Sequence, residues 1–538
     1  MTPPRPAAAA DAGAAPEAAD GRRAALGRAG LAAIGTSIGC FLLTALLGPS
    51  AMQPELRGDP GQPPYALTVH PPPHLVIGLV AAGLVVGTLG LGLCWSAVRR
   101  GWRCRTSALT AAGLLATAAF TLMPPIGSAD HLNYAAYGRM AVIGHDPYVT
   151  RAVDVPGDPV ISEVEEWRRA PSVYGPIATA GQAMASWSGG DSVRLTVFVL
   201  SLLNALAFTL TAWILHRAAR TDERRLRVAL LWTCNPLLLF HLVGGAHNDT
   251  LAVCPMVAGV ALFSARFEAG RRGVPLRAAA SGALIAVGAA IKLPAAIAGG
   301  GLAWAVLRGA FTHRGAGRDD GGRVAADRWR AALSAAALAA GALAVTLVTY
   351  AIAGSHTFDP IRRAADQVSL ATPWHLVDLV LGRDNRVVIK FAWLTLFAVL
   401  TILLARALPR RGPGTDTGAE AERVAAALVL AWLLAAPYEL PWYSGFAWAA
   451  LALLPWSRFD WLLLAHTCAL SLGYLPARDP KLIGLPASLD WLLEVVRPGV
   501  IPVALTVILI AALRMCLRRP GPAPAPAPPR RSPTASPG

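Results

Sequence analysis

The sequence predicts an all-α, polytopic membrane protein with about fourteen (12–14) transmembrane helices, and its composition and hydropathy are the observations that predict it. Of the 538 residues, 54% are hydrophobic and only 15% are charged, whereas soluble domains carry about 25% charged residues. The mean hydropathy is +0.48, and long uncharged runs recur from residue 30 to residue 517. These values exclude a soluble enzyme and a disordered scaffold.

A membrane span needs about 20 apolar residues. The apolar runs lie near 27–47, 74–98, 106–125, 192–216, 227–245, 250–267, 277–291, 293–307, 331–353, 387–408, 424–438, 445–457, 460–475 and 499–517. The pairs around Lys292 and Tyr443 are short, so re-entrant segments are an alternative there. The membrane domain is expected to occupy 27–517. The tails 1–26 and 518–538 are rich in Ala, Pro and Arg, which predicts disorder.

Basic residues predict the orientation. The arginines gather in the loops after the second, fourth and sixth predicted spans and in 308–330. Because cytoplasmic loops carry an excess of Lys and Arg, these loops and both tails are expected on the cytoplasmic side of the plasma (inner) membrane. The net charge of +16 then reflects membrane orientation, and no nucleic-acid partner is expected.

The opposite, extracytoplasmic face carries the longer loops, namely 48–73, 126–191, 354–386 and 476–498. An enzyme that acts on extracytoplasmic substrates needs ordered loops and polar groups on one side only, so an active site is expected on this face. The sequence has no Walker-type loop, no HExxH and no Rossmann fingerprint. Its cysteines show no paired CxxC spacing. No cofactor and no metal are therefore expected.

Several polar groups interrupt the apolar pattern on this face. Asp130 follows the third span in an aromatic-rich segment that continues to Arg139. It is a candidate catalytic acid or base at the membrane interface, or alternatively the cap of a short helix. His247, Asn248 and Asp249 stand between two apolar runs, where polar side chains are costly. They form a candidate substrate or catalytic cluster, or alternatively a hairpin turn in which Asp249 caps a span.

Lys292 is one of three lysines in an arginine-rich chain and interrupts a long uncharged stretch. It is a candidate partner for a phosphate group, or alternatively a side chain that snorkels to the interface. Trp442 and Tyr443 belong to a proline-bracketed aromatic turn, and His375 lies in another outer loop. The aromatic residues are either interfacial anchors or sugar contacts, and the histidine can titrate near neutral pH.

Four short motifs occur together in a fixed order. They are an Asp just past an early span (Asp130), a Tyr-Gly-Pro that closes the first large outer loop (174–176), a Gly-x-His-Asn-Asp turn (245–249) and a Lys-x-Pro turn (292–294). This set resembles the polyprenol-phosphate-mannose-dependent α-(1→6)-mannosyltransferases of actinobacteria, membrane glycosyltransferases of GT-C architecture. Within them it is most similar to the enzymes that start the lipomannan backbone. The resemblance covers roughly residues 30–515.

The resemblance implies an inverting glycosyltransferase that moves mannose from polyprenyl-phosphate-mannose to a lipid-anchored α-(1→6)-mannan acceptor, among membrane lipids and without a cofactor. A single inverting displacement needs a base but no enzyme nucleophile. The resemblance assigns the remaining roles. Asp130 matches the expected base, and Lys292 and Arg139 match the phosphate partners. Residues 247–249 match an orienting cluster, in which His247 and Asp249 are further catalytic candidates. Tyr174 and Trp442 match sugar or prenyl contacts. Related enzymes often carry two adjacent acids where this chain has Asp130 and His131, so the base acts alone or with His131, His247 or His375.

Three alternatives stay open. A GT-C transferase for another lipid-linked sugar, such as arabinose or glucose, would need the same fold and a different set of loop contacts. A transporter of lipid or sugar predicts a path of ionisable residues deep inside the spans, whereas the span interiors here are nearly bare of them. A non-catalytic membrane scaffold would not require Asp130, Asp249 and Lys292 to gather on one face.

Overall fold

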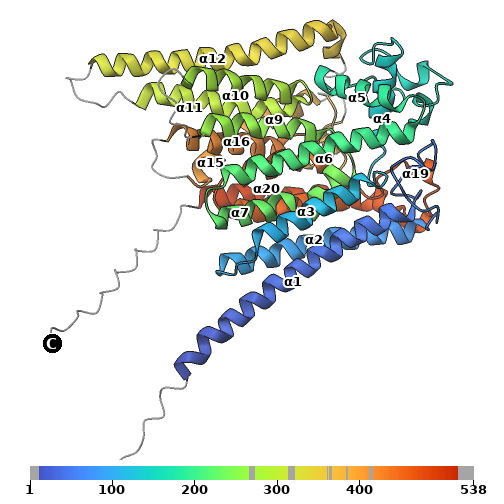
Figure 1. Ribbon diagram of the computed structural model, residues 1–538, viewed down its shortest axis with the longest axis horizontal. Coiled ribbons are helices and arrows are strands. Elements are labelled where there is room, and N and C mark those ends of the chain that lie inside the picture. Colours follow the sequence, from blue (N-terminus) through green and yellow to red (C-terminus); the bar gives the residue numbers. More distant parts are fainter. Residues whose placement is uncertain are drawn as a thin grey trace, which may run out of the picture.

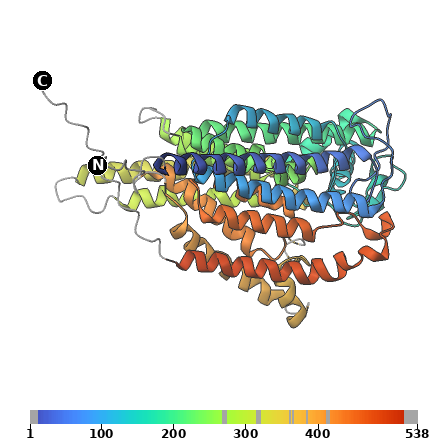
Figure 2. The same cartoon turned by 90° about the horizontal axis from the view of Figure 1, so that it is seen from below.

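The computed structural model describes residues 11–265, 273–312, 321–359, 362, 366–382, 386–410 and 416–518. Over these residues the chain is helical, and its only β pairing is a single bridge between Ser50 and Gln53. The all-α class is therefore confirmed for this part of the chain. The long helices run side by side and form one elongated bundle (Figures 1 and 2).

The first half of the bundle consists of long helices and one helix with two π-helical segments. The long helices are α1 (Asp11–Leu47), α2 (Pro73–Arg99), α3 (Thr106–Thr121), α6 (Val193–Ala218) and α9 (Asp249–Ser264). The interrupted helix contains α7 (Asp222–Val228), η3 (Ala229–Thr233), α8 (Pro236–Leu238) and η4 (Leu239–Gly244). Its whole apolar stretch is buried, and π-helical turns often lie at functional sites. It leads directly into the turn that carries His247.

The second half of the chain contributes further helices, several of which pack directly on helices of the first half. They are α10 (Gly273–Ala289), η5 (Leu293–Ala298), α11 (Gly299–Thr312), α12 (Gly321–Ala353), α15 (Arg386–Ala407), α16 (Thr417–Ala435), α17 (Ser444–Ala452), α18 (Arg458–Gly473), η11 (Leu492–Val500) and α20 (Ile501–Leu517). The helix α12 lies along one edge and α1 along the opposite edge (Figure 1).

Short helices gather at one end of the bundle. Of these, α4 (Asp130–Val142), α5 (Pro176–Gly189) and α19 (Pro480–Ile483) lie together at that end (Figure 1). Further short elements lie in the connections between the long helices. They are the helix α14 (Pro373–Leu381) and the short turns η1 (Ala152–Asp154), η2 (Ile161–Glu163), η7 (Ser355–Thr357), η9 (Pro441–Tyr443) and η10 (Ala487–Leu489). The start of α1 and the end of α20 lie at the opposite end (Figure 2).

Every predicted apolar run lies within or overlaps a helix, but the number of fourteen spans is not confirmed. Among the described residues, seven helices are long and apolar enough to cross a membrane, and four shorter apolar helices accompany them. The run at 445–457 illustrates the difference. It overlaps α17, a helix of nine residues, which is much shorter than the about 20 residues that a span needs.

The first described residues are helical. Residues 1–10 and 519–538, which include most of the predicted C-terminal tail, lie outside the described residues. The helix α1 begins at Asp11 and so takes in much of the segment 1–26 that was expected to be disordered. Alanine is the strongest helix former, and this segment is alanine-rich.

Candidate functional site

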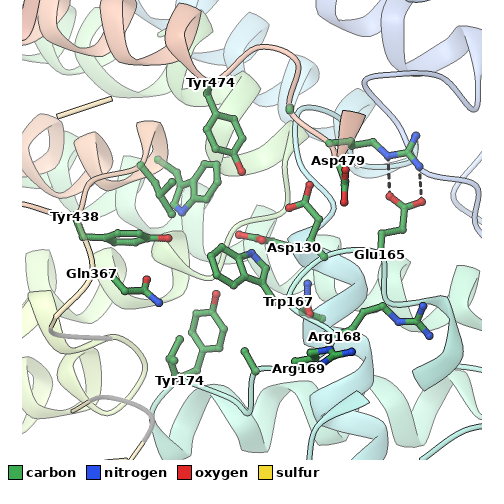
Figure 3. A pocket seen from close by; sticks show the side chains of 18 of the residues that line it. Asp130, Glu165, Trp167, Arg168, Arg169, Tyr174, Gln367, Tyr438, Tyr474 and Asp479 are labelled. Carbon is green, nitrogen blue, oxygen red and sulfur yellow. Dashed lines mark hydrogen bonds and ion pairs between the residues drawn. The ribbon is translucent and has the colours of Figure 1, made fainter. Parts of the chain in front are cut away.

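A cavity of about 780 Å³ opens at the end of the bundle that carries α4 and α19 (Figure 3). Side chains from the loops 163–174, 438–443 and 474–480, together with α4, supply most of its wall. The charged and aromatic lining residues are Asp130, Tyr137, Glu165, Glu166, Trp167, Arg168, Arg169, Tyr174, Lys292, Tyr438, Trp442, Tyr443, Tyr474, Arg478, Asp479 and Arg497. Residues far apart in the sequence therefore meet in one cleft.

Asp130 is the first residue of α4 and faces this cavity. Its carboxylate does not cap the helix, because the cap position is held by Ala129 and shows no side-chain hydrogen bond. Instead, Oδ2 of Asp130 lies 3.5 Å from the donating hydroxyl of Tyr134 and 3.6 Å from Nδ1 of His247. Burial raises the pKa of Asp130 to about 6, partly offset by the charge of Lys292. At neutral pH this carboxyl is mostly ionised and can accept a proton.

His247 lies behind the cavity wall and is fully buried. Its ring stacks on Trp442, with the ring centroids 3.5 Å apart and an interplanar angle of 15°. Its Nδ1 also lies 3.4 Å from the Tyr134 hydroxyl. Burial, followed by the nearby charge of other histidines and Lys292, holds the pKa of His247 well below its usual range. A neutral imidazole therefore supports Asp130 from behind.

Asp249 and Lys292 form an ion pair at the edge of the cavity. Lys292 Nζ lies 2.7 Å from Oδ2 of Asp249, whose side chain is fully buried. The ammonium also lies 4.3 Å from the ring centroid of Tyr443 and 5.7 Å from that of Tyr174. Asp249 is the first residue of α9 without making a side-chain cap. Its neighbour Asn248 is buried and is not part of the cavity lining.

The Tyr174-Gly175-Pro176 sequence places Tyr174 beside Lys292. The backbone N–H of Gly175 donates to the carbonyl of Ile291 at 3.1 Å. A Cβ at Gly175 would overlap the carbonyl of Ala290, so only glycine allows this close approach. Pro176 then starts α5 at its first position, where proline is favoured.

Besides Asn248, two further predicted substrate-binding residues, Arg139 and His375, lie outside the cavity lining. Arg139 Nε lies 2.8 Å from Asp158 and its Nη2 lies 2.6 Å from Asp191. The guanidinium is thus paired with two carboxylates outside the cavity lining. His375 lies in the first turn of α14, and its backbone N–H donates to the carbonyl of Thr372. The structure gives neither residue a contact with the cavity.

The structure also brings in residues that were not predicted. The loop segment Glu165–Arg169 lines the cavity, as do Tyr438, Tyr474 and Arg497. Arg478 fixes this segment through an ion pair with Glu165, in which Nε lies 2.8 Å from Oε2 (Figure 3). The concentration of charge at 163–169 was the available sequence signal, because such a run in an outer loop has two uses, solvation or a binding site.

The arrangement combines a partly buried base with a cation held by a counter-charge. Within the described residues, no group of three His, Cys, Asp or Glu side chains could hold a metal ion. Asp130 can take a proton, and Lys292 can stabilise an anion that develops nearby.

Comparisons with known proteins agree with the resemblance. The family described as alpha-(1->6)-mannopyranosyltransferase, N-terminal domain, matches residues 34–308. The chain is 32% identical over 176 residues to alpha-(1->6)-mannopyranosyltransferase A of Corynebacterium glutamicum, which is 32% of this chain and 34% of that protein. It is 31% identical over 248 residues to alpha-(1->6)-mannopyranosyltransferase A of Mycobacterium tuberculosis, 44% of this chain and 45% of that protein. The chain thus spans less than half the length of these relatives.

Among solved structures, the crystal structure of ArnT from Cupriavidus metallidurans bound to undecaprenyl phosphate matches with a TM-score of 0.39. The match has 13% sequence identity and covers 76% of each chain.

Proposed function

The chain belongs to the alpha-(1->6)-mannopyranosyltransferase family, and from this premise we propose that it is an inverting mannosyltransferase. Its donor would be polyprenyl-phosphate-mannose and its acceptor a lipid-anchored α-(1→6)-mannan or lipoglycan. Transfer would take place at the outer face of the plasma membrane, with both termini in the cytoplasm. The observation that carries the proposal is Asp130, a carboxylate at the wall of a cavity, supported by a buried imidazole and facing a lysine.

In the proposed reaction, an acceptor hydroxyl attacks the anomeric carbon of the donor mannose. The new C–O bond forms as the bond between that carbon and the phosphate oxygen breaks, so the anomeric configuration inverts in one displacement. Asp130 accepts the hydroxyl proton. The polyprenyl phosphate leaves as an anion with the bonding electrons, and no covalent enzyme intermediate is required.

Lys292 is the group proposed to bind the donor phosphate. Its side chain lines the cavity and is only 12% exposed, so its charge is weakly screened and acts at short range. Asp249 holds the ammonium in place before the donor binds. In this account His247 and Asp249 are positioning residues, because they lie behind the lining and act through Asp130 and Lys292. Trp442 and Tyr443 line the cavity, where Trp442 stacks on His247 and Tyr443 lies against the Lys292 ammonium.

The test uses membranes that contain the protein and a short α-(1→6)-mannoside acceptor. Labelled polyprenyl-phosphate-mannose is supplied in one arm, and polyprenyl-phosphate-glucose and polyprenyl-phosphate-arabinose in others. The proposal expects transfer from the mannose donor alone and an α-(1→6) linkage in the product by NMR. Transfer from another donor would show that the protein is a transferase for a different sugar. Movement of labelled lipid across vesicles without any glycosidic product would support a transporter and overturn the proposal.

A further inference from the structure

Trp167 has an unusual backbone conformation at the mouth of the cavity. Its φ is +58°, a left-handed value that is rare for a bulky residue and is often found where side chains are aimed for a function. The side chain lines the cavity and keeps 50% of its surface exposed. Figure 3 shows the indole projecting into the same cavity as Asp130 and Tyr174.

The loop around Trp167 is fastened on both sides. Before it, Glu163 pairs with Arg57 at 2.9 Å, and Glu165 pairs with Arg478. After it, the carbonyl of Trp167 accepts from the N–H of Ala170 at 2.8 Å. The hydroxyl of Tyr137 donates to the carbonyl of Ala170 at 3.1 Å. Contacts on both sides therefore hold the left-handed turn in place, and the ring itself is left open toward the cavity.

Glu166 supplies a polar group next to this ring. It lines the cavity, and burial followed by the charge of nearby carboxylates raises its pKa to about 8. The carboxylates are Asp130, Glu165 and Asp479. At neutral pH the carboxyl is mostly protonated and so presents both a donor and an acceptor. The charge of Arg497 partly offsets this rise in the pKa of Glu166.

We propose that Trp167 and Glu166 form the acceptor subsite, in which a mannosyl residue of the acceptor stacks on the indole and hydrogen-bonds to the carboxyl. The inference rests on the proposed function. The polarised C–H groups on one face of a hexose fit the electron-rich face of an indole, and its hydroxyls need partners that can both donate and accept. The acceptor is the partner that extends into water, which matches a half-exposed ring at the cavity mouth. The donor sugar would lie deeper, between Asp130 and Lys292.

An interfacial anchor is the other common role of an exposed tryptophan. An anchor needs no special backbone conformation and no contact with a cavity. Trp187, which is 77% exposed on α5 and lies outside the cavity lining, has the features of such an anchor. It provides a matched control, because its replacement removes a similar exposed ring from the same end of the molecule.

The experiment compares Trp167→Gly, Trp167→Asn and Trp167→Phe with Trp187→Ala in the full-length protein in nanodiscs. Glycine and asparagine tolerate a positive φ, so they remove the ring and keep the turn. We expect the first two variants to raise KM for a short α-(1→6)-mannoside by about tenfold or more, and Phe by less than about threefold. KM for the mannose donor and kcat should stay within about twofold, as should all constants of Trp187→Ala.

Saturation-transfer NMR without donor measures binding of the mannoside alone, and so it separates this inference from the proposed function. One outcome is that the wild type binds the mannoside, that Trp167→Gly and Trp167→Asn lose this binding, and that the wild type transfers no mannose. The acceptor subsite would then be supported and the proposed function would be wrong. If the wild type transfers mannose while both variants keep the acceptor KM, the proposed function stands and the subsite is wrong. A rise in donor KM equal to the rise in acceptor KM would also overturn the subsite.

Discussion

The ammonium of Lys292 lies 2.7 Å from the buried carboxylate of Asp249 and 4.3 Å from the ring centroid of Tyr443. The contact joins the turn before η5 to the first turn of α9 and to η9. Three segments that are distant in the sequence are thus fixed by one cation. The ion pair gives the Lys292 side chain a structural role as well as the proposed role at the donor phosphate.

Removing one partner of this pair should destabilise the protein. Lys292→Met leaves the Asp249 charge buried without compensation, which costs about 3 to 5 kcal/mol in the free energy of unfolding. The double variant Lys292→Met/Asp249→Asn removes both charges and should regain most of the lost thermal stability in detergent. If Lys292 binds the donor phosphate, the double variant stays at least about tenfold impaired in kcat/KM for the donor. Activity that returns together with stability would limit Lys292 to a structural role.

The rate should depend on pH through Asp130. A base acts when it is deprotonated, and the pKa of Asp130 is raised to about 6. Activity should therefore rise with pH, by about tenfold in kcat/KM between pH 5 and pH 7. The nearest groups to this carboxyl are Tyr134, His247, Asp249 and Lys292, and Glu166 and several tyrosines also interact with its charge. A profile that is flat or that falls over this range would argue against Asp130 as the base.

A second change is expected at higher pH. Glu166, whose pKa is raised to about 8, loses its proton there and can no longer donate a hydrogen bond. KM for the acceptor should therefore rise above pH 8, and Glu166→Gln, which keeps a donor at all pH values, should abolish that rise. The same dependence in the Gln variant would assign the effect to another group.

Gly175 should tolerate no side chain. Gly175→Ala places a methyl group against the carbonyl of Ala290 and should cost about 1 to 3 kcal/mol in stability. It should also move Tyr174 away from Lys292 and lower transfer. Gly181→Ala is the matched control, because this α5 glycine has no atom within 4 Å of a built Cβ. That variant should be neutral or slightly stabilising. Equal melting temperatures of Gly175→Ala and Gly181→Ala would contradict the close approach of Gly175 to the carbonyl of Ala290.

Arg139 should matter for stability and not for the donor. Its ion pairs with Asp158 and Asp191 connect α4 to the segment that follows η1 and to the turn between α5 and α6. Arg139→Gln should reduce the free energy of unfolding by about 1 to 3 kcal/mol. In variants assayed below their melting temperature, KM for the donor should stay near the wild-type value. A tenfold rise in donor KM would restore the role that the sequence predicted for this arginine.

The membrane class and the helix positions could be predicted because a long apolar run is a local property of the sequence. The number of spans could not be predicted in the same way, since the apolar run that overlaps α17 forms a helix of only nine residues. The grouping of Asp130, His247, Asp249 and Lys292 was predictable from sidedness, because alternate connections of a helical bundle meet at the same end. Which of them face the cavity was not predictable. That depends on side-chain direction, and it leaves His247 and Asp249 behind the wall.

The other differences come from contacts between distant residues. Arg478 and Glu165 are separated by 313 positions, and their pairing brings Glu166 and Trp167 into the cavity wall. Arg139 meets Asp158 and Asp191 at separations of 19 and 52 positions. A single sequence gives no sign of such pairs, so it could not show that the arginine is already neutralised.

The most direct test of the central claim compares Asp130→Asn with the wild type at matched expression. Transfer is measured from labelled polyprenyl-phosphate-mannose to an α-(1→6)-mannoside. Asp59→Asn is the control, because Asp59 is exposed in an outer loop and its Oδ1 accepts from Gly61 N–H, a role that asparagine can keep. The account predicts a loss of more than about a hundredfold in Asp130→Asn, with unchanged folding and an unaffected control. Transfer that survives in a folded Asp130→Asn protein would contradict it.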